Sequence, residues 1–285
     1  MGNSSSKRKS AIVNNYMDFF SAKDPSLPTD ERMQLGSHII RELWGENFSS
    51  PIKDLLKKGG ATVLDVGCGT GTWMFDLAAD YQKSSYVGVD MVRLFPAGTE
   101  PFNVKFVNGN VLNGLPFEDG TFDFVHVQFL VFDIKEADWE SIVYKELVRV
   151  LKPGGWLEIS EPEFRCSKVG EVTQKFITAG TKRFSSMGVN IHIASRHLEI
   201  MSGISELTSI HHQERGYPLN KWQGKLAETG RKYMRETCGN LMQNIHGDMK
   251  IKKKKIDEMM DEMVEEWKVY EPFINIHRFF GRKLM

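Results

Sequence analysis

Residues 62–73 read TVLDVGCGTGTW, and this stretch decides the fold. Its first part, residues 63–66, is short and largely apolar, which predicts a buried parallel strand. Three glycines at alternate positions follow, and the helix-like segment 73–78 comes directly after them. A strand, a glycine turn and a helix in this order bring backbone N–H groups and a helix N-terminus close to a ligand. The stretch therefore predicts a ligand-binding turn, although an ordinary glycine-rich turn has the same pattern.

The spacing of the glycines separates two kinds of cofactor site. A dinucleotide-binding turn has the pattern GxGxxG, whose third glycine lets the helix pack closely on the strand. Here the glycines are Gly67, Gly69 and Gly71, and Thr72 stands where that third glycine would be. Asp65 lies within the strand, two positions before the turn. The missing glycine disfavours a dehydrogenase.

Composition predicts a globular protein with one large domain or one elaborated domain. The chain has 285 residues, of which 41% are hydrophobic and 26% charged. Its formal net charge is zero, so we expect no general attraction to nucleic acid. Three distant cysteines, Cys68, Cys166 and Cys238, indicate a reducing compartment and no disulfide framework. No apolar run reaches about 18 residues, so we expect no transmembrane helix.

The first twelve residues predict a disordered basic tail. They fit the acceptor pattern MGxxxS for N-myristoylation at Gly2, with Ser6 in the required place. One myristoyl chain binds a membrane weakly, and the basic residues 7–9 would supply a second signal. A plain solubilising tail is the alternative. We expect a cytoplasmic protein that associates with a membrane if Gly2 is acylated.

Beyond the tail, strands and helices alternate, which predicts an α/β fold with a doubly wound, mostly parallel sheet. The expected strands are 63–66, 85–90, 103–107, 124–128, 156–160, 206–213 and 273–280, seven in all. The expected helices include 12–20, 30–48, 52–58, 138–150, 168–187, 193–201 and 250–268. We divide the chain into a tail (1–12), N-terminal helices that form a lid (13–58), a cofactor-binding core (59–165) and a C-terminal part (166–285) that completes the sheet.

Polar side chains gather where the strands end. Asp90 ends the second strand about twenty residues after the glycine turn, where a βαβ fold places a carboxylate beside a ribose. A helix cap or a surface acid is the alternative role for Asp90. Asn110 and Gln128 follow the third and fourth strands. Ligands of such sheets bind at the carboxyl ends of the strands, so we expect these residues around one crevice.

These motifs carry a family resemblance. Residues 65–71 read DVGCGTG, residues 87–90 read VGVD and residues 146–158 read ELVRVLKPGGWLE. Over roughly 60–165 and 205–282 the chain resembles the class I S-adenosylmethionine-dependent methyltransferases. It is similar to the fungal group that includes the LaeA-type regulators of secondary metabolism, also in residues 216–222, which read GYPLNKW.

The resemblance implies S-adenosyl-L-methionine as the cofactor and a Rossmann-like fold with these roles. Gly67, Cys68, Gly69 and Gly71 form the turn around the methionine part, Asp65 orients its amino group, Asp90 binds the ribose, Met91 packs on the adenine, Asn110 and Val111 lie at the adenine edge, and Gln128 lies near the amino-acid end. The chain departs from the family twice. Asn110 stands where the family usually has aspartate, and Gln128 stands where the fungal group commonly has a basic residue.

The acceptor and the catalytic groups follow less directly. Methyl transfer needs positioning and exclusion of water, and a general base only where the nucleophile carries a proton. His126 is a candidate base, with a packed core histidine as the alternative. Glu161 and Glu163 could orient an amine or a cation near the site, or be surface acids. The histidines show no metal-ligand spacing, so we expect no metal.

Three functions remain open from the sequence. The first is a methyltransferase that acts on a small molecule, with the helical segments as its lid. The second is a protein methyltransferase or a regulatory protein of the LaeA type, and the resemblance then implies a nuclear location. The third is a cofactor-binding module without catalysis. The sequence alone indicates neither an oligomeric state nor the atom that is methylated.

Overall fold

A computed structural model describes residues 29–96, 98, 100–164, 168–220, 224–270 and 272–285. The chain divides into two compact units. The unit that we call the sheet unit comprises residues 37–165, 184–217 and 274–285, and the helical unit comprises residues up to 36, 166–183 and 218–273. The basic tail with Gly2, the expected helix 12–20 and Cys166 lie outside the described residues.

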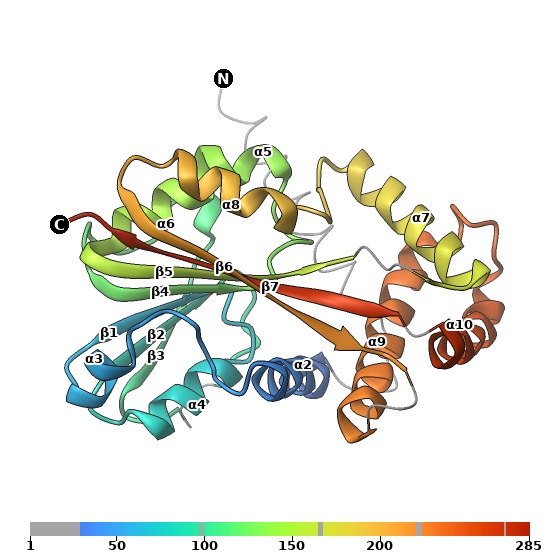
Figure 1. Ribbon diagram of the computed structural model, residues 1–285, viewed down its shortest axis with the longest axis horizontal. Helices are drawn as coiled ribbons and strands as arrows, with labels where there is room; N and C mark the ends of the chain where they lie inside the picture. Colours follow the sequence, from blue (N-terminus) through green and yellow to red (C-terminus); the bar gives the residue numbers. More distant parts are fainter. Residues whose placement is uncertain (1–28, 97, 99, 165–167, 221–223, 271) are drawn as a thin grey trace. The chain divides into compact units, whose positions relative to one another are not determined.

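The sheet has seven strands in the order β3-β2-β1-β4-β5-β7-β6 (Figure 1). They are β1 (Thr62–Val66), β2 (Ser85–Asp90), β3 (Val104–Asn108), β4 (Phe122–Gln128), β5 (Leu151–Glu163), β6 (Leu207–Pro218) and β7 (Phe273–Lys283). Neighbours from β3 to β5 are parallel, and β7 is antiparallel to β5. The expected doubly wound, mostly parallel sheet is confirmed.

Helices of the sheet unit cover both faces of the sheet (Figure 1). On one face, α3 (Lys53–Lys58) and α4 (Thr72–Asp80) bury Leu56, Met74 and Leu77 against Val63 and Phe124. On the other face lie α5 (Glu136–Asp138), the π-helical turn η2 (Trp139–Val143), α6 (Tyr144–Val150) and α8 (Ala194–Gly203). The one-turn 3₁₀ helix η1 (Val111–Asn113) follows β3. The two apolar layers make the sheet the centre of the core.

The helical unit is built around α9 (Gly224–Ile245) and α10 (Ile256–Tyr270), which follows the short 3₁₀ helix η3 (Lys253–Lys255). The apolar stripe of α10, which includes Met259, Met260 and Met263, is buried. Glu266 of α10 accepts hydrogen bonds from the backbone N–H groups of Val172 and Thr173, both at 2.8 Å. These donors open α7 (Glu171–Ser186), so the carboxylate caps that helix. The remaining helix, α2 (Thr29–Trp44), begins in this unit.

Several expected boundaries are wrong, including the end of the strand expected at 206–213, which runs to Pro218. The strand expected at 156–160 runs from Leu151 to Glu163, so the glycine-rich segment 151–155 lies inside it. Its pairing with β4 shifts between Phe122 and Phe124, so the glycine-rich segment is accommodated as an irregularity within the strand. The first long helix ends at Trp44 and not at residue 48.

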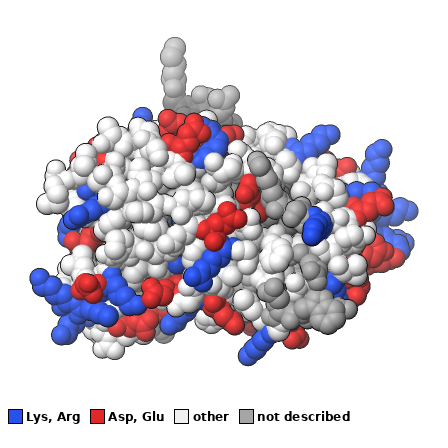
Figure 2. Space-filling view, in the orientation of Figure 1, with Lys and Arg blue, Asp and Glu red and all other residues white. Residues whose placement is uncertain are grey.

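Charged side chains are mixed in sign on the face drawn in Figure 2, where Lys and Arg lie beside Asp and Glu over much of the surface. Among the helices that the structure describes, none combines the length and the apolar character needed to cross a membrane.

Candidate functional site

The glycine turn adopts a backbone that only glycine takes easily. Gly67, Gly69 and Gly71 have φ values of +75°, +53° and +78°. A Cβ on Gly67 would lie 2.5 Å from Leu130 Cδ2, and one on Gly71 would lie 2.5 Å from Phe106 Cζ. The turn is closed by hydrogen bonds from Gly67 N to the Val89 carbonyl and from Gly71 N to the Cys68 carbonyl, both at 2.8 Å. Conformation therefore favours glycine at all three positions, and space favours it at Gly67 and Gly71 as well.

Asp90 is joined to this turn directly. Its Oδ2 accepts a hydrogen bond from Gly69 N at 2.9 Å, and its Oδ1 accepts one from Val92 N at 2.8 Å. Burial raises the pKa of Asp90 above its ordinary value, and the two N–H donors oppose that rise. The structure thus brings together the turn and the acidic residue that the sequence separates by 21 positions.

Three partly exposed aromatic rings stand beside the turn. Phe106 of β3 stacks on Phe95 with ring centroids 4.6 Å apart and meets the edge of Phe75 at 5.7 Å. The same Phe106 ring limits the space at Gly71. Sequence reasoning missed this aromatic cluster, because Phe75, Phe95 and Phe106 belong to three separate segments with no common motif.

The segments after β2 and β3 are tied to each other. The Asn108 side chain donates to the carbonyls of Asp90 and Met91 at 3.1 and 3.0 Å. Asn110 Oδ1 accepts from Leu112 N at 2.9 Å and so caps η1, in which Val111 is buried. Met91 is partly buried. The segment that carries the expected adenine-edge residues is therefore tied to the end of β2 through Asn108, and the Asn110 amide oxygen already has a backbone partner.

The loop after β4 lies against the glycine turn through Leu130. Glu161 holds this loop, because its carboxylate accepts from Leu130 N at 2.8 Å and from Val131 N at 3.2 Å. Burial raises the pKa of Glu161 well above its ordinary value, although both donors favour the charged form. Glu161 is fully buried, so the alternative of a surface acid is wrong for it.

Buried polar atoms around this loop have no hydrogen-bond partner among the described residues. They are Gln128 Oε1 at the end of β4, Ser160 Oγ on the neighbouring strand, and Asp133 Oδ1 in the loop itself. Gln128 and Ser160 are direct cross-strand neighbours. Burial raises the pKa of Asp133 well above its ordinary value, and the charge of Asp90 adds to the rise. Unpaired buried polar atoms are costly, so a ligand that supplies partners to these atoms would be favoured.

Asp65 and His126 form a buried pair on β1 and β4. His126 Nδ1 lies 2.8 Å from Asp65 Oδ1, and its ring stacks on Trp73 with centroids 3.8 Å apart. His126 has no exposed surface. This placement favours the packed-core alternative, because a general base must reach its acceptor. It also gives Asp65 a partner that sequence reasoning missed.

A second buried acid continues this polar row. Glu158 lies opposite His126 on β5 and accepts from Ser49 N, Ser50 N and Ser50 Oγ at 2.7–3.0 Å. Arg278 Nε lies 3.6 Å from Glu158 Oε1, and burial lowers the pKa of Arg278 to about 10. The guanidinium stands over the Trp44 ring at 4.5 Å. This network anchors the segment before α3 to the sheet. No sequence motif predicted it.

The last two predicted residues lie in different surroundings. Cys68 is buried within the glycine turn, and burial raises the pKa of its thiol. Its sulfur lies 2.8 Å from the place that a Cβ on Gly88 would occupy, so the thiol packs against β2. Glu163 is partly buried and pairs with His277, with Glu163 Oε2 3.4 Å from His277 Nε2.

Comparisons with known proteins agree with this geometry. Residues 63–155 match the family described as methyltransferase domain. The secondary metabolism regulator laeA of Aspergillus niger is 30% identical over 214 residues, which cover 69% of this chain and 53% of that protein. The demethylmenaquinone methyltransferase of Bacillus licheniformis is 39% identical over 113 residues, which cover 36% of this chain and 47% of that protein.

A solved structure extends the likeness in fold. The Haemonchus contortus phosphoethanolamine N-methyltransferase 2, solved with S-adenosylhomocysteine, aligns with a TM-score of 0.51 at 17% identity, covering 88% of this chain and 58% of that one. The chain spans 35% to 58% of the length of the first curated relatives that it matches. The chain therefore carries a methyltransferase domain with the class I methyltransferase fold and is similar to the LaeA-type regulators.

Proposed function

We propose that this protein binds S-adenosyl-L-methionine and transfers its methyl group to a small molecule. The observation that carries the proposal is the 2.9 Å hydrogen bond from Gly69 N to Asp90 Oδ2, which unites the glycine turn with the acid at the end of β2. Among the curated relatives, a demethylmenaquinone methyltransferase is named for a small acceptor, which supports the same class of acceptor here.

The residues fit the cofactor. The bare backbone at Gly67, Gly69 and Gly71 gives the methionine part close access to the turn. Each carboxylate oxygen of Asp90 uses one site for a backbone N–H and keeps further acceptor capacity for the ribose hydroxyls. Phe95 and Phe106 offer apolar rings beside the ribose position, where Met91 would pack on the adenine.

The loop after β4 would serve the reacting end of the cofactor. Gln128 Oε1 and Asp133 Oδ1 are buried acceptors without partners, so they fit a ligand that brings N–H or O–H donors. The amino group of the methionine part is one such donor, and an amine or hydroxyl of the acceptor is another. Glu161 fixes the backbone that carries these groups.

Methyl transfer at this site would require little from the protein beyond positioning of the two reactants. When bound, the cofactor supplies an activated methyl group on a sulfonium, and its leaving group departs as a neutral thioether. The chain's residues would hold the two reactants in line and exclude water. We assign no general base, because His126 is enclosed between Trp73 and Asp65.

Similarity to the LaeA-type regulators favours a second candidate, a regulatory protein or a protein methyltransferase. Incubation with labelled S-adenosylmethionine and a cell extract separates the candidates. Label in the fraction below protein size supports a small acceptor, and label only in protein bands supports the second candidate.

Calorimetric titration with S-adenosylmethionine and S-adenosylhomocysteine tests the cofactor first. We expect micromolar binding of both, weakened about tenfold or more by Asp90→Ala, because a charge-assisted contact is lost. Asp80→Ala, which removes a half-exposed carboxylate at the end of α4, is the matched control and should leave affinity unchanged. Asp90→Asn retains an acceptor for Gly69 N and guards against misfolding. If the folded wild-type chain binds neither compound, the proposal fails.

A further inference from the structure

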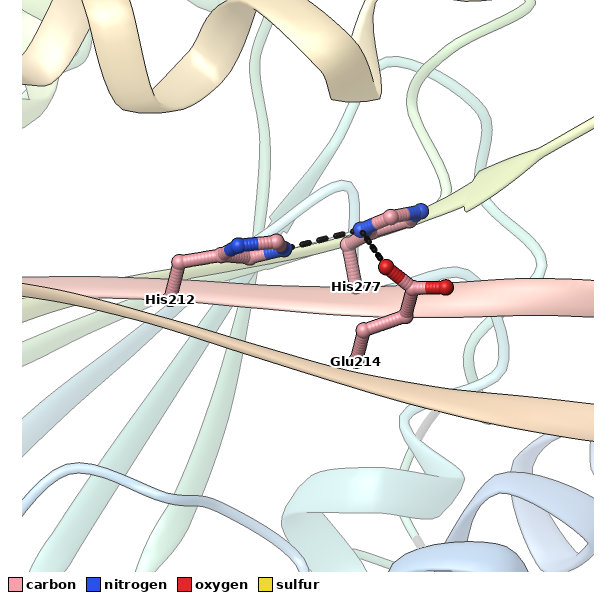
Figure 3. Close-up of side chains that lie close together, drawn as sticks. All are labelled: His212, Glu214 and His277. Carbon is pink, nitrogen blue, oxygen red and sulfur yellow. Dashed lines mark hydrogen bonds and ion pairs between the residues drawn. The ribbon is translucent and has the colours of Figure 1, made fainter.

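Two strands at the edge of the sheet bring a cluster of histidine and glutamate side chains together. His212 and Glu214 lie on β6, and His277 lies on the neighbouring strand β7 (Figure 3). His212 Nε2 is 2.8 Å from His277 Nδ1, and Glu214 Oε2 is 3.8 Å from the same nitrogen. One ligand atom from each residue lies within 4.8 Å of the other two. Positions 212 and 214 are two apart on a strand and so share a face.

These separations suit a small divalent ion. Ligand atoms that bind zinc tetrahedrally at 2.0–2.1 Å are about 3.4 Å apart. The distances from His277 Nδ1 to His212 Nε2 and to Glu214 Oε2, 2.8 and 3.8 Å, lie on either side of that value. Small rotations of the exposed His212 and Glu214 side chains would equalise them, while the buried His277 provides a fixed point.

His277 is oriented as a metal-binding histidine usually is. Its Nε2 lies 3.4 Å from Glu163 Oε2, so a proton on Nε2 leaves Nδ1 free of hydrogen and directed at His212 and Glu214. Metal-bound histidines characteristically donate their second ring N–H to a carboxylate, which fixes the tautomer. Stacking of the His212 ring on Phe279, with centroids 4.5 Å apart, orders the second imidazole.

We propose that His212, Glu214 and His277 bind one divalent transition-metal ion of the zinc type. Two imidazoles and one carboxylate match zinc chemistry, whereas calcium and magnesium prefer oxygen ligands alone. Because His212 and Glu214 are exposed, water reaches the cluster and can fill the fourth position.

The bound ion would link the edge strand to its neighbour. β6 is largely exposed between Thr208 and Gly216, and an edge strand carries unpaired backbone groups on its outer side. Coordination of one ion by residues of β6 and β7 would hold the two strands side by side through metal–ligand bonds, in addition to their backbone hydrogen bonds. We therefore expect metal binding to stabilise the sheet unit as any ligand of the folded state does.

The test uses the full chain without an affinity tag, freed of metal by a chelator. In a calorimetric titration, the chain should bind one equivalent of Zn²⁺ tightly. The Co²⁺-loaded chain should show the visible absorption of a tetrahedral site. His212→Ala and Glu214→Gln should each weaken the Zn²⁺ affinity by about tenfold or more. Both positions are exposed, so the variants should fold, which circular dichroism verifies.

His211→Ala is the matched control. His211 adjoins His212 on the same strand and stacks on Phe280 at 5.0 Å, away from the cluster. The His211→Ala variant should bind one equivalent of Zn²⁺ with the affinity of the wild-type chain. Glu163→Gln should lower affinity about 10- to 100-fold, as loss of a supporting carboxylate does.

Two results would overturn the assignment: a wild-type chain that takes up no zinc, or a zinc equivalent that His212→Ala and His211→Ala affect equally. The outcome is independent of the proposed methyl transfer, because zinc binding is measured without S-adenosylmethionine and should persist in Asp90→Ala.

Discussion

The glycine turn and the β6–β7 edge lie on one sheet but are assembled in different ways. The turn is a contiguous stretch, residues 62–73, whose glycines leave room for the neighbouring side chains of Leu130 and Phe106. The edge cluster joins His212 to a histidine 65 positions later. The first kind of site can be predicted from spacing along the chain. The second exists only once the strand order and register are known.

The largest effect should come from filling the space inside the turn. Gly71→Ala places a methyl group 2.5 Å from the Phe106 ring at a φ of +78°. Gly45 has a similar φ of +72° but nothing within 4 Å of its Cβ position, so Gly45→Ala isolates the conformational cost. We expect about 1–2 kcal/mol of destabilisation in Gly45→Ala and a further 1–3 kcal/mol or so in Gly71→Ala.

Urea unfolding measures these costs, and calorimetry measures the accompanying loss of S-adenosylmethionine affinity. We expect that loss to exceed about tenfold in Gly71→Ala alone. Equal stability and equal affinity in the two variants would show that close approach at Gly71 does not matter.

The same contrast explains how much of the molecule the sequence predicted. Strands, helices and the pairing of the turn with Asp90 follow from local periodicity and from a standard βαβ spacing. Glu158 could not be predicted to cap Ser49 and Ser50, because these partners are more than 100 residues apart and their meeting depends on register. Likewise, the strand is expected to begin only at Trp156, but β5 begins at Leu151 and includes Gly154 and Gly155, because the strand pairs with β4 from Leu151 onward.

Glu161 connects the two regions, since it lies on β5 opposite His277 and holds the loop that touches the glycine turn. The folded-state pKa of Glu161 is raised above the ordinary value of 4.5, so the folded chain is most stable when Glu161 is protonated. The contribution of Glu161 to the free energy of unfolding is fully present below about pH 4.5. It is lost as the pH rises through the folded-state pKa, by about 1.4 kcal/mol per pH unit.

Glu161→Gln removes this titration and keeps one acceptor oxygen for the loop. We expect the wild-type chain to lose unfolding free energy relative to Glu161→Gln between pH 5 and pH 8. Urea unfolding of both proteins at the two pH values provides the measurement. A difference that stays constant with pH would mean that Glu161 does not titrate differently in the folded and unfolded states.

The smallest effect concerns Asn110, where the chain departs from the family pattern. Asn110 Oδ1 caps η1 through Leu112 N, and aspartate can accept the same hydrogen bond. Asn110→Asp should therefore preserve the fold, and its added charge should strengthen binding of the adenine amino group only modestly, by roughly two- to fivefold. Asn110→Ala is the comparison variant, because it removes the side chain that caps η1. It should lower the free energy of unfolding by about 1 kcal/mol. Calorimetry with S-adenosylmethionine measures the affinity of both variants, and urea unfolding measures the stability lost in Asn110→Ala. If Asn110→Asp weakens binding, the amide N–H₂ group of asparagine contributes to the cofactor contact, and the departure at this position is an adaptation of the site and not a defect in it.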